Sequence, residues 1–332
     1  MKYFVYPLSF ETPVHFGTAD NGGNLESVDM VLSSDTMFSA ICHEAGNADV
    51  IEQFVEALQH HTFLLSSAFP YVWEKEGYSL YLPKPLYGVM KDRPSRNLTE
   101  TKREAIRQKK QKKEKFIRAM YLSSEDTGRY VSSDSNREDV SAFAESFTQT
   151  YVNLRGDGSE PYNVGAYTFA PNAGLFIIVG FENLELKSTW DALLTSLGLT
   201  GIGGERSSGY GKFITRDTLC VKADSNEQDI RALSRLISND TATWKLTISA
   251  TAPAKEEVVH LQDGYYKLKK RSGFIASPGH EGIKRNTYYV LMEGSCVPHA
   301  IHGRVITFRT PAIGHAIYRN GAGFCIGVVY DE

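Results

Sequence analysis

The sequence predicts an α+β protein with two sheet-bearing domains, the first of them ferredoxin-like. At 332 residues the chain is long for a single hydrophobic core. Outside one long insertion, its first part alternates strands and helices in the order β-α-β-β-α-β. Aromatic residues make up 11% of the chain, which fits β-rich structure and also fits platforms that stack nucleic-acid bases.

The first elements follow from hydrophobic periodicity. Every second side chain of residues 2–10 is apolar or aromatic, which predicts a strand. A helix is expected to begin at Ser34 or Asp35, either of which can cap it, and to end at Gly46. A second helix is predicted over residues 49–59, because its apolar side chains recur at helical spacing.

A hairpin comes next, with strands over residues 62–73 and 78–82 around a charged turn. The periodic pattern is then lost over residues 91–161, which we interpret as an insertion, partly helical and partly mobile. The continuous apolar run 174–181 predicts a central strand. A helix over 189–199 leads into a glycine-rich loop.

The last elements divide the chain into two domains. A strand over residues 212–221 closes the first domain, and an acidic linker follows it. Three strands, over 244–248, 286–291 and 304–308, then indicate a second, more divergent sheet domain. We place the domains at residues 1–223 and 241–332, with the insertion at about 91–170.

The charge of the chain is unevenly distributed. Residues 102–118 hold nine basic and two acidic side chains, a local charge of +7. Because the whole chain carries −3, the remainder carries −10. A basic patch on an acidic body can steer a polyanion to one place. A solvated lysine-rich helix or a disordered loop explains the run equally well.

Cysteine usage and hydropathy indicate the cellular compartment. The four cysteines lie far apart with no C-x-x-C pair, which argues against a zinc site or a disulfide framework and fits a reducing cytoplasm. The N-terminus has no apolar run of signal-peptide length, and no stretch approaches the roughly 20 apolar residues that span a bilayer. We therefore expect a cytoplasmic protein without membrane contact or metal.

Five glycines lie between residues 201 and 211, but they match neither nucleotide-binding template. In G-x-G-x-x-G the last glycine would fall on Arg206, and the segment follows a helix rather than a strand. In a P-loop the first glycine would again fall on Arg206, and Phe213 replaces the residue that holds magnesium. A nucleotide cofactor is therefore disfavoured, and we expect no cofactor.

The same loop suits an RNA backbone. Glycines allow positive φ and close approach of N–H groups to an anion, and serine hydroxyls and arginine can bind phosphate. A connection that needs its glycines only for packing is the alternative. The residues of this loop that we expect at the RNA are Gly201, Gly203, Gly204, Arg206, Ser207, Ser208, Gly209, Tyr210, Gly211 and Lys212.

The string GIGGERSSGYGKF closely resembles the glycine-rich loop of the RAMP superfamily, the RNA-binding subunits of CRISPR effector complexes. Three further segments, YPLSFETPVHFG, SDTMFSAIC and HAIYRNGAGFCIGV, match one branch of it. In order and spacing they resemble the subunit of type III-A (Csm) complexes that binds the 5′ handle of the guide RNA. The resemblance covers nearly the whole chain outside residues 91–160.

This resemblance implies two ferredoxin-like (RRM-like) domains and a set of partners. They are the crRNA 5′ handle, the large polymerase-like subunit, the backbone RAMP subunits and, near the handle, target RNA. The glycine loop would contact handle phosphates. An opposing wall would include the start of the first helix, because helix N-termini favour anions. It comprises His15, Phe16, Gly17, Ser34, Asp35 and Thr36.

The family also has a β-hairpin thumb that kinks the guide. We expect it within residues 151–168, with Arg155 as a contact. Lys270, Arg271 and Arg319 are candidate contacts of the second domain, although ordinary surface charge and a hairpin turn explain them equally well. Asn320 and Ala322 depart from the aromatic and basic residues more usual in the family, which puts phosphate contact at that turn in doubt.

A non-catalytic scaffold is the expected function, and a metal-independent pre-crRNA processing endoribonuclease is the alternative. Relatives with the same loop cut RNA by acid–base chemistry, and His15 is the best candidate base. In those enzymes the loop lies near the C-terminus, whereas about 120 residues follow it here. The length of chain after the loop favours the scaffold.

Overall fold

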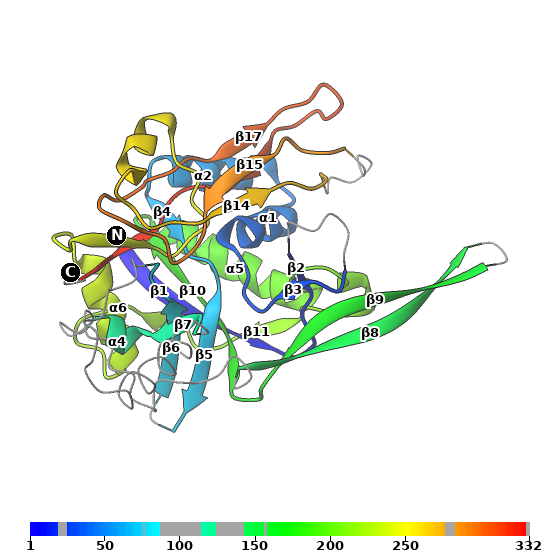
Figure 1. The fold of residues 1–332 in the computed structure, drawn as a ribbon, viewed down its shortest axis with the longest axis horizontal. Coiled ribbons are helices and arrows are strands. Elements are labelled where there is room, and N and C mark those ends of the chain that lie inside the picture. The colour runs from blue at the N-terminus through cyan, green and yellow to red at the C-terminus, as the bar shows by residue number, and fades with distance from the viewer. Residues whose placement is uncertain are drawn as a thin grey trace, which may run out of the picture.

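A central antiparallel sheet organises the chain (Figure 1). The computed structural model describes residues 1–18, 25–75, 77–86, 114–123, 143–155, 158–275 and 283–329. The strands follow the order β11-β1-β10-β5-β6-β7, while β12 also pairs with β1 and β4 with β10. Their bounds are β1 (Lys2–Phe10), β4 (Phe63–Leu65), β5 (Phe69–Glu74), β6 (Gly77–Pro83), β7 (Phe116–Arg118), β10 (Ala173–Phe181), β11 (Phe213–Thr215) and β12 (Leu219–Cys220).

Both faces of this sheet are covered, which explains why β10 is apolar along its whole length. Ile177 belongs to a core beneath α1 (Ser34–Ala45), α2 (Ala48–Gln59) and α5 (Leu184–Thr200). Phe176 and Ile178 point to the opposite face, because side chains alternate along a strand. There they pack under α4 (Ala119–Leu122), α6 (Gln228–Ser238) and the last part of the chain.

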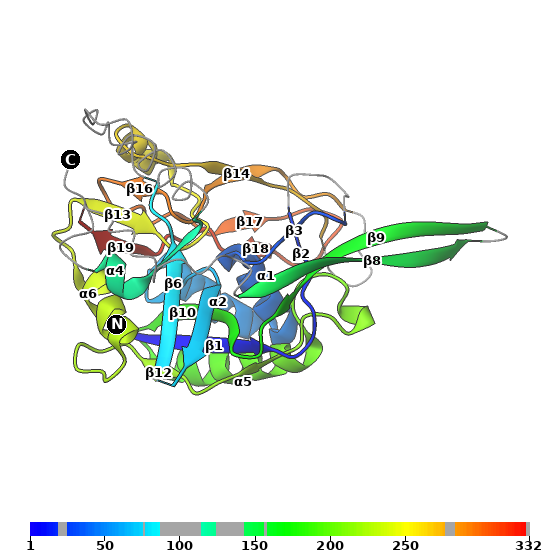
Figure 2. The same ribbon diagram turned by 60° about the horizontal axis from the view of Figure 1, so that its bottom comes forward.

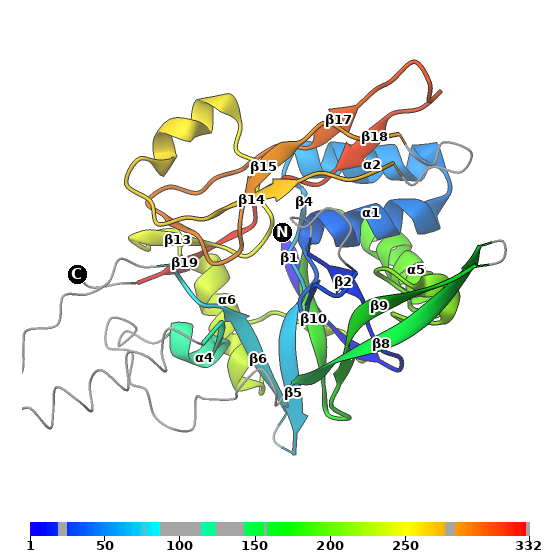
Figure 3. The ribbon, with the colours of Figure 1, turned by 45° about the vertical axis from the view of Figure 1, so that its right-hand side comes forward.

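That last part holds a three-stranded sheet and two ribbons, all antiparallel (Figure 2). The sheet has the order β16-β13-β19, with β13 (Trp244–Thr247), β16 (Cys296–Val297) and β19 (Cys325–Val328). The ribbons lie over α1 and α2 (Figure 3). They are β14 (Leu268–Arg271) with β15 (Tyr288–Leu291), and β17 (Ile306–Phe308) with β18 (Ile317–Arg319).

A long two-stranded ribbon projects from the body and is called the thumb here (Figures 1 and 2). It consists of β8 (Ala144–Arg155) and β9 (Gly158–Phe169), paired along their whole length. At its base it meets a shorter pair, β2 (Phe16–Gly17) with β3 (Val28–Asp29). The expected hairpin within residues 151–168 is therefore part of a longer one.

The expected element order of the first part is present, but several bounds differ. The helix α5 begins at Leu184 rather than near residue 189, because the Asn183 side chain caps it by accepting a hydrogen bond from the backbone N–H of Glu185. The cap of α1 is Ser33, not Ser34 or Asp35. The strand expected over 212–221 is split into β11 and β12.

The interpretation of residues 224–240 as a linker was wrong. They include α6, which buries Ile230, Leu233 and Leu236 against the sheet. Asp229, at its start, is fully buried and accepts hydrogen bonds from the backbone N–H groups of Leu80 and Met120. A carboxylate with these partners has a structural role, although in the sequence its polarity suggested an exposed linker.

None of the helices in the described ranges is both long and apolar enough to cross a membrane.

Candidate RNA interface

The glycine loop joins α5 to β11 and is fastened to the segment before β2. The Gly204 N–H donates to the carbonyl of His15 at 2.9 Å, and the Gly211 N–H donates to the carbonyl of Pro13 at 2.7 Å. Inside the loop, the Ile202 N–H donates to the Gly211 carbonyl at 3.0 Å. These N–H groups are therefore already occupied and are not free to receive an anion.

Packing accounts for four of the five glycines. Gly201, Gly203 and Gly211 have φ between 77° and 101°, and a Cβ on any of them would lie 2.0 to 2.6 Å from a backbone oxygen. A Cβ on Gly204 would lie 2.5 Å from the His15 ring. Gly209 differs, because its φ is 87° but nothing lies within 4 Å of the Cβ position. The packing explanation left open by the sequence therefore applies to four glycines.

The exposed part of the loop is its tip. Arg206, Ser207 and Ser208 form a single exposed 3-10 turn between two residues in the left-handed conformation, Glu205 and Gly209. Lys212 is also exposed, and its backbone N–H donates to the Thr12 hydroxyl at 2.9 Å. The side chains that can reach a ligand are thus concentrated at the tip.

His15 and Tyr210 instead connect the loop to the thumb. His15 is 6% exposed, and its Nδ1 lies 2.8 Å from the Gly165 carbonyl on β9. The Tyr210 hydroxyl is within hydrogen-bond distance of the Tyr151 hydroxyl, at 3.1 Å, and of the Gln149 side chain, at 2.9 Å. Burial, followed by the hydrogen bond with Tyr151, raises the pKa of Tyr210 to about 12.

The two residues that follow His15 differ in exposure, because Phe16 is buried and Gly17 is exposed.

The start of α1 is turned towards the last part of the chain. The Ser34 hydroxyl is buried and accepts from the Ala250 N–H at 3.0 Å. Asp35 is also buried, and its carboxylate lies 3.0 Å from an Arg271 guanidinium nitrogen. Ser34 and Asp35 therefore hold two parts of the chain together, and of the expected α1 residues only Thr36 is partly exposed.

Positive charge gathers along the outer side of α1. Arg319 donates to the Ser39 hydroxyl at 2.5 Å. One turn further on, His43 has its pKa lowered by burial and then by the charges of Arg206 and Arg319. Burial, followed by the charge of Arg319, lowers the pKa of Arg285 to about 10. We call the group Arg206, His43, Arg271, Arg285 and Arg319 the cationic cluster.

Carboxylates also lie beside this cluster. Asp35 is the carboxylate paired with Arg271. Glu44, next to His43, accepts hydrogen bonds from Ser196 and Thr200 on α5 at 2.7 and 2.6 Å. The Nε atoms of Arg271 and Arg285 are buried without a hydrogen-bond partner in the described part of the chain. Unpaired buried donors of a cation favour a bound anion.

Sequence reasoning found three members of the cluster and missed two. Arg206, Arg271 and Arg319 were expected at the RNA. His43 could have been found from helical spacing, because it lies four residues after Ser39 and seven after Thr36 on one face of α1. No sequence signal marks Arg285, which only the fold of the β14–β15 ribbon brings to α1.

Two expected contact sites lie outside the described residues, one of them in part. Residues 102–113 of the basic run lie outside the described residues, as does the Arg155 side chain at the end of β8. Arg118, at the end of the run, lies 2.8 Å from the buried carboxylate of Asp229 and so has a structural partner. Lys270 is exposed on β14.

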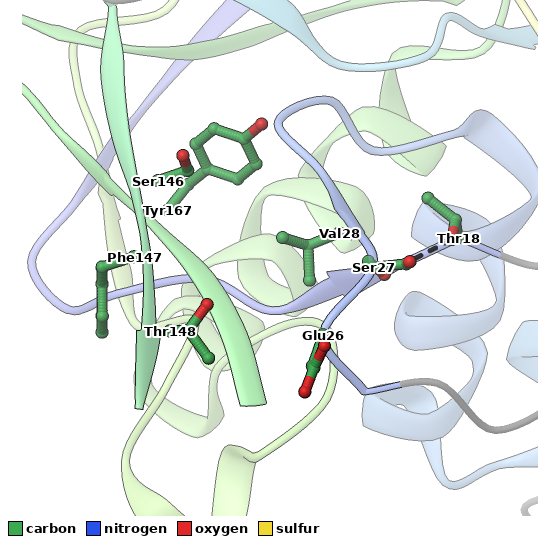
Figure 4. Close-up of a pocket in the computed structure, with 8 residues that line it drawn as sticks. All are labelled: Thr18, Glu26, Ser27, Val28, Ser146, Phe147, Thr148 and Tyr167. Atoms are coloured by element: carbon green, nitrogen blue, oxygen red, sulfur yellow. Dashed lines mark hydrogen bonds between the residues drawn. The ribbon is translucent and has the colours of Figure 1, made fainter. Parts of the chain in front are cut away.

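A cavity of about 550 Å³ lies between the thumb and β3 (Figure 4). Its lining includes one carboxylate, Glu26, and no cationic side chain, so the cavity does not suit a phosphate group. The lining residues are Thr18, Glu26, Ser27, Val28, Ser146, Phe147, Thr148 and Tyr167. In the described ranges, no group of three or more His, Cys, Asp or Glu residues could hold a metal ion.

Comparison with known proteins gives consistent matches. Residues 240–328 match the CRISPR Csm4 C-terminal domain. The CRISPR system Cms protein Csm4 of Streptococcus thermophilus is 26% identical over 321 residues, which cover 96% of each chain. The Csm4 protein of Mycobacterium tuberculosis (strain CDC 1551 / Oshkosh) is 28% identical over 299 residues, covering 88% of this chain and 87% of the relative.

Solved structures share the fold. A chain of a Csm1–Csm4 cassette in complex with cA4 superimposes with a TM-score of 0.63 and 17% identity, over 100% of both chains. A chain of a Csm3–Csm4 subcomplex of the type III-A interference complex superimposes with a TM-score of 0.58 and 16% identity. The match covers 98% of this chain and 99% of that one. The last part of the chain thus matches the Csm4 C-terminal domain, and nearly the whole chain is similar to Csm4 proteins.

Proposed function

We propose that this chain is a non-catalytic RNA-binding scaffold of a type III-A CRISPR interference complex that anchors the 5′ handle of the crRNA. The cationic cluster on α1 carries this proposal. Its side chains come from the glycine loop, from α1 and from the two ribbons above it. A phosphate backbone laid along α1 would meet the exposed Arg206 and His43 and the partly exposed Arg285 and Arg319, whereas Arg271 is buried against Asp35.

The charges of the cluster favour a polyanion for a physical reason. Burial, followed by neighbouring arginines, lowers the pKa values of His43 and Arg285, so like charges lie close together there in the free protein. A phosphate group relieves that repulsion and can pair with the planar guanidinium groups through two hydrogen bonds. The exposed tip, with Arg206, Ser207, Ser208 and Lys212, extends the same surface.

The proposed partners follow from the family. The solved structures that share the fold come from Csm1–Csm4 and Csm3–Csm4 assemblies. We place this chain between the large polymerase-like subunit and the backbone subunits, with target RNA near the handle. We also assign two ferredoxin-like domains, at 1–223 and 241–332. The strand order β11-β1-β10-β5 around α1 and α5 supports the first assignment.

The environment of His15 favours a scaffold over the endoribonuclease. Its ring is buried, Nδ1 contacts the Gly165 carbonyl, and Gly204 packs against its edge. A general base must reach the proton that it removes, and this ring is enclosed. Incubation with repeat RNA tests the alternative: metal-independent cleavage that is lost in His15→Ala would overturn the scaffold.

The main test is purification of the tagged chain from its host, with sequencing of the RNA that accompanies it. We expect guide RNA with a common 5′ handle, and less of it with Arg206→Ala. In binding assays this variant should reduce the slope of log K against log salt by about one. Arg235→Ala, an exposed arginine on α6, is the matched control and should change neither. Recovery of as much RNA from Arg206→Ala and from an Arg206→Ala/Arg319→Ala double variant as from the unmodified chain would contradict the proposal.

A further inference from the structure

The β14–β15 ribbon has two faces of different character. Residues directly opposite each other in an antiparallel pair share a face. On the inner face, Arg271 pairs across the ribbon with Tyr288, and both contact Asp35 on α1, at 3.0 and 3.4 Å. Lys269 lies on the same face, 3.4 Å from Asp29. The inner face is thus fully engaged with the body.

The outer face presents an aromatic ring beside a lysine. Lys270 lies directly opposite Tyr289, and Tyr289 is 57% exposed. Leu268, two residues before Lys270, shares that face and is exposed as well. Further along the ribbon, Phe274 lies opposite Lys284 and is 62% exposed. A second pair of an exposed aromatic ring and a lysine therefore lies further along the ribbon, beyond a one-residue shift in register (Figure 3 shows the ribbon over α1).

These side chains lack partners within the described part of the chain. Lys270 and Lys284 make no ion pair there, and neither Tyr289 nor Phe274 packs against another ring. Burying such rings against a flat ligand recovers the free energy that their exposure to water costs. The face is therefore built for a ligand that is both flat and anionic.

Charge decides between RNA and protein as the occupant. Lysine is depleted at the centre of protein–protein interfaces, whereas single-stranded nucleic acids are bound by aromatic rings that stack bases beside cations that follow the backbone. Arg271 of the cluster is adjacent to Lys270 in β14, although the two side chains lie on opposite faces of the ribbon. An RNA held at the cluster reaches the outer face by passing around an edge of the ribbon.

We propose that the outer face of the β14–β15 ribbon stacks a base of single-stranded RNA on Tyr289, with Lys270 beside the phosphates, and that Phe274 and Lys284 form a second such pair further along the ribbon. The proposal rests on the proposed function, since it assigns a second contact to the same RNA. The cluster binds phosphates, and the ribbon stacks bases without sequence specificity.

The test uses the full-length chain and single-stranded poly(U) that contains 4-thiouridine. Tyr289→Ala should weaken binding about five-fold or more without changing the salt slope, because no phosphate contact is removed. Tyr289→Phe keeps the ring and should bind like the unmodified protein. Trp73→Ala, another exposed aromatic residue on β5, should have no effect. Photo-crosslinked peptides should include the ribbon.

Each outcome has one meaning. Binding that depends on Arg206 but not on Tyr289, with no crosslink to the ribbon, overturns this inference and leaves the proposed function intact. No RNA binding by the unmodified chain overturns both. Unchanged RNA affinity with loss of a co-purifying protein in Tyr289→Ala would identify the face as a protein interface and also overturn the inference.

Discussion

Gly209 and Gly211 lie two residues apart in the same backbone region, but only Gly209 has space for a side chain. An L-residue in the left-handed region costs roughly 1–2 kcal/mol, so alanine at either position should carry that cost. Gly211→Ala should cost clearly more, because its Cβ would lie 2.0 Å from the Ile202 carbonyl oxygen. Urea unfolding of the two variants measures the difference. Equal destabilisation would mean that the loop is not packed as described.

His43 should make RNA binding dependent on pH. Its pKa in the free protein is lowered by burial and by Arg206 and Arg319, against a smaller opposing effect of Glu44. A bound phosphate raises that pKa, so binding takes up a proton. Affinity should therefore rise as the pH falls through the pKa of His43 in the complex. It should level off below the pKa of the free protein.

Fluorescence anisotropy of a labelled RNA, measured from about pH 7.5 down to about pH 5.5, covers the range around the ordinary histidine pKa. The variant His43→Gln should bind more weakly at low pH and lose most of the pH dependence. His260→Gln, a histidine outside the cluster, should retain it. A pH profile unchanged by His43→Gln would exclude this role.

At the scale of elements, Tyr210 fixes the thumb to the glycine loop. Tyr210→Phe keeps the ring but removes hydrogen bonds to Tyr151 and Gln149, each worth about 0.5–1.5 kcal/mol. We expect faster amide hydrogen exchange along β8 and β9 and little change in β1 or β10. Asn163→Ala, which removes the exposed contact of β9 with Glu26, is a milder comparison. Exchange that accelerates equally throughout the chain would indicate general destabilisation instead.

The sequence predicted an element well where the apolar side chains of its periodic pattern are the ones that the fold buries. The strands β1 and β10 and the helices α1 and α2 fall where expected, because each buries the side chains that its periodicity marks. The beginning of β8 was missed, because residues 145–150 are mostly exposed and have no apolar alternation. The helix α6 was missed because its apolar stripe is short and because Asp229, which is buried, has the polarity expected of an exposed linker residue.

The candidate site was harder to predict than the fold. The loop tip with Arg206 follows from local sequence, but the burial of Asp35 depends on Arg271 and Tyr288, more than 200 residues away. Pairing over that distance is decided by tertiary packing rather than by any local pattern. The same holds for Arg285.

At the scale of the whole molecule, histidine pairs join distant parts of the chain. The rings of His61, after α2, and His302, before β17, are 4.9 Å apart. The pKa of His61 is lowered by burial and then by His302, with Glu257 opposing and His60 adding to the effect. Between the lowered folded pKa and the ordinary value of about 6.5, the unfolded chain binds more protons. Stability should therefore fall as the pH drops below about 6.5.

Thermal unfolding across this range tests the effect. His61→Asn accepts a positive φ readily and cannot be protonated, so it should flatten the pH dependence. The exposed His315→Asn is the control and should leave the profile unchanged. A profile that is equally steep in His61→Asn would exclude His61 as its source.

The cationic cluster draws its side chains from both ends of the chain. Arg206 and His43 precede residue 223, whereas Arg271, Arg285 and Arg319 follow residue 241. A guide RNA bound there would act as a cross-link between the two parts, in addition to being held by them. RNA binding and the contact between the two parts of the chain are then coupled in both directions. Any change that weakens the contact of Asp35 with Arg271 lowers the affinity for RNA. Loss of the RNA weakens that contact by the same free energy.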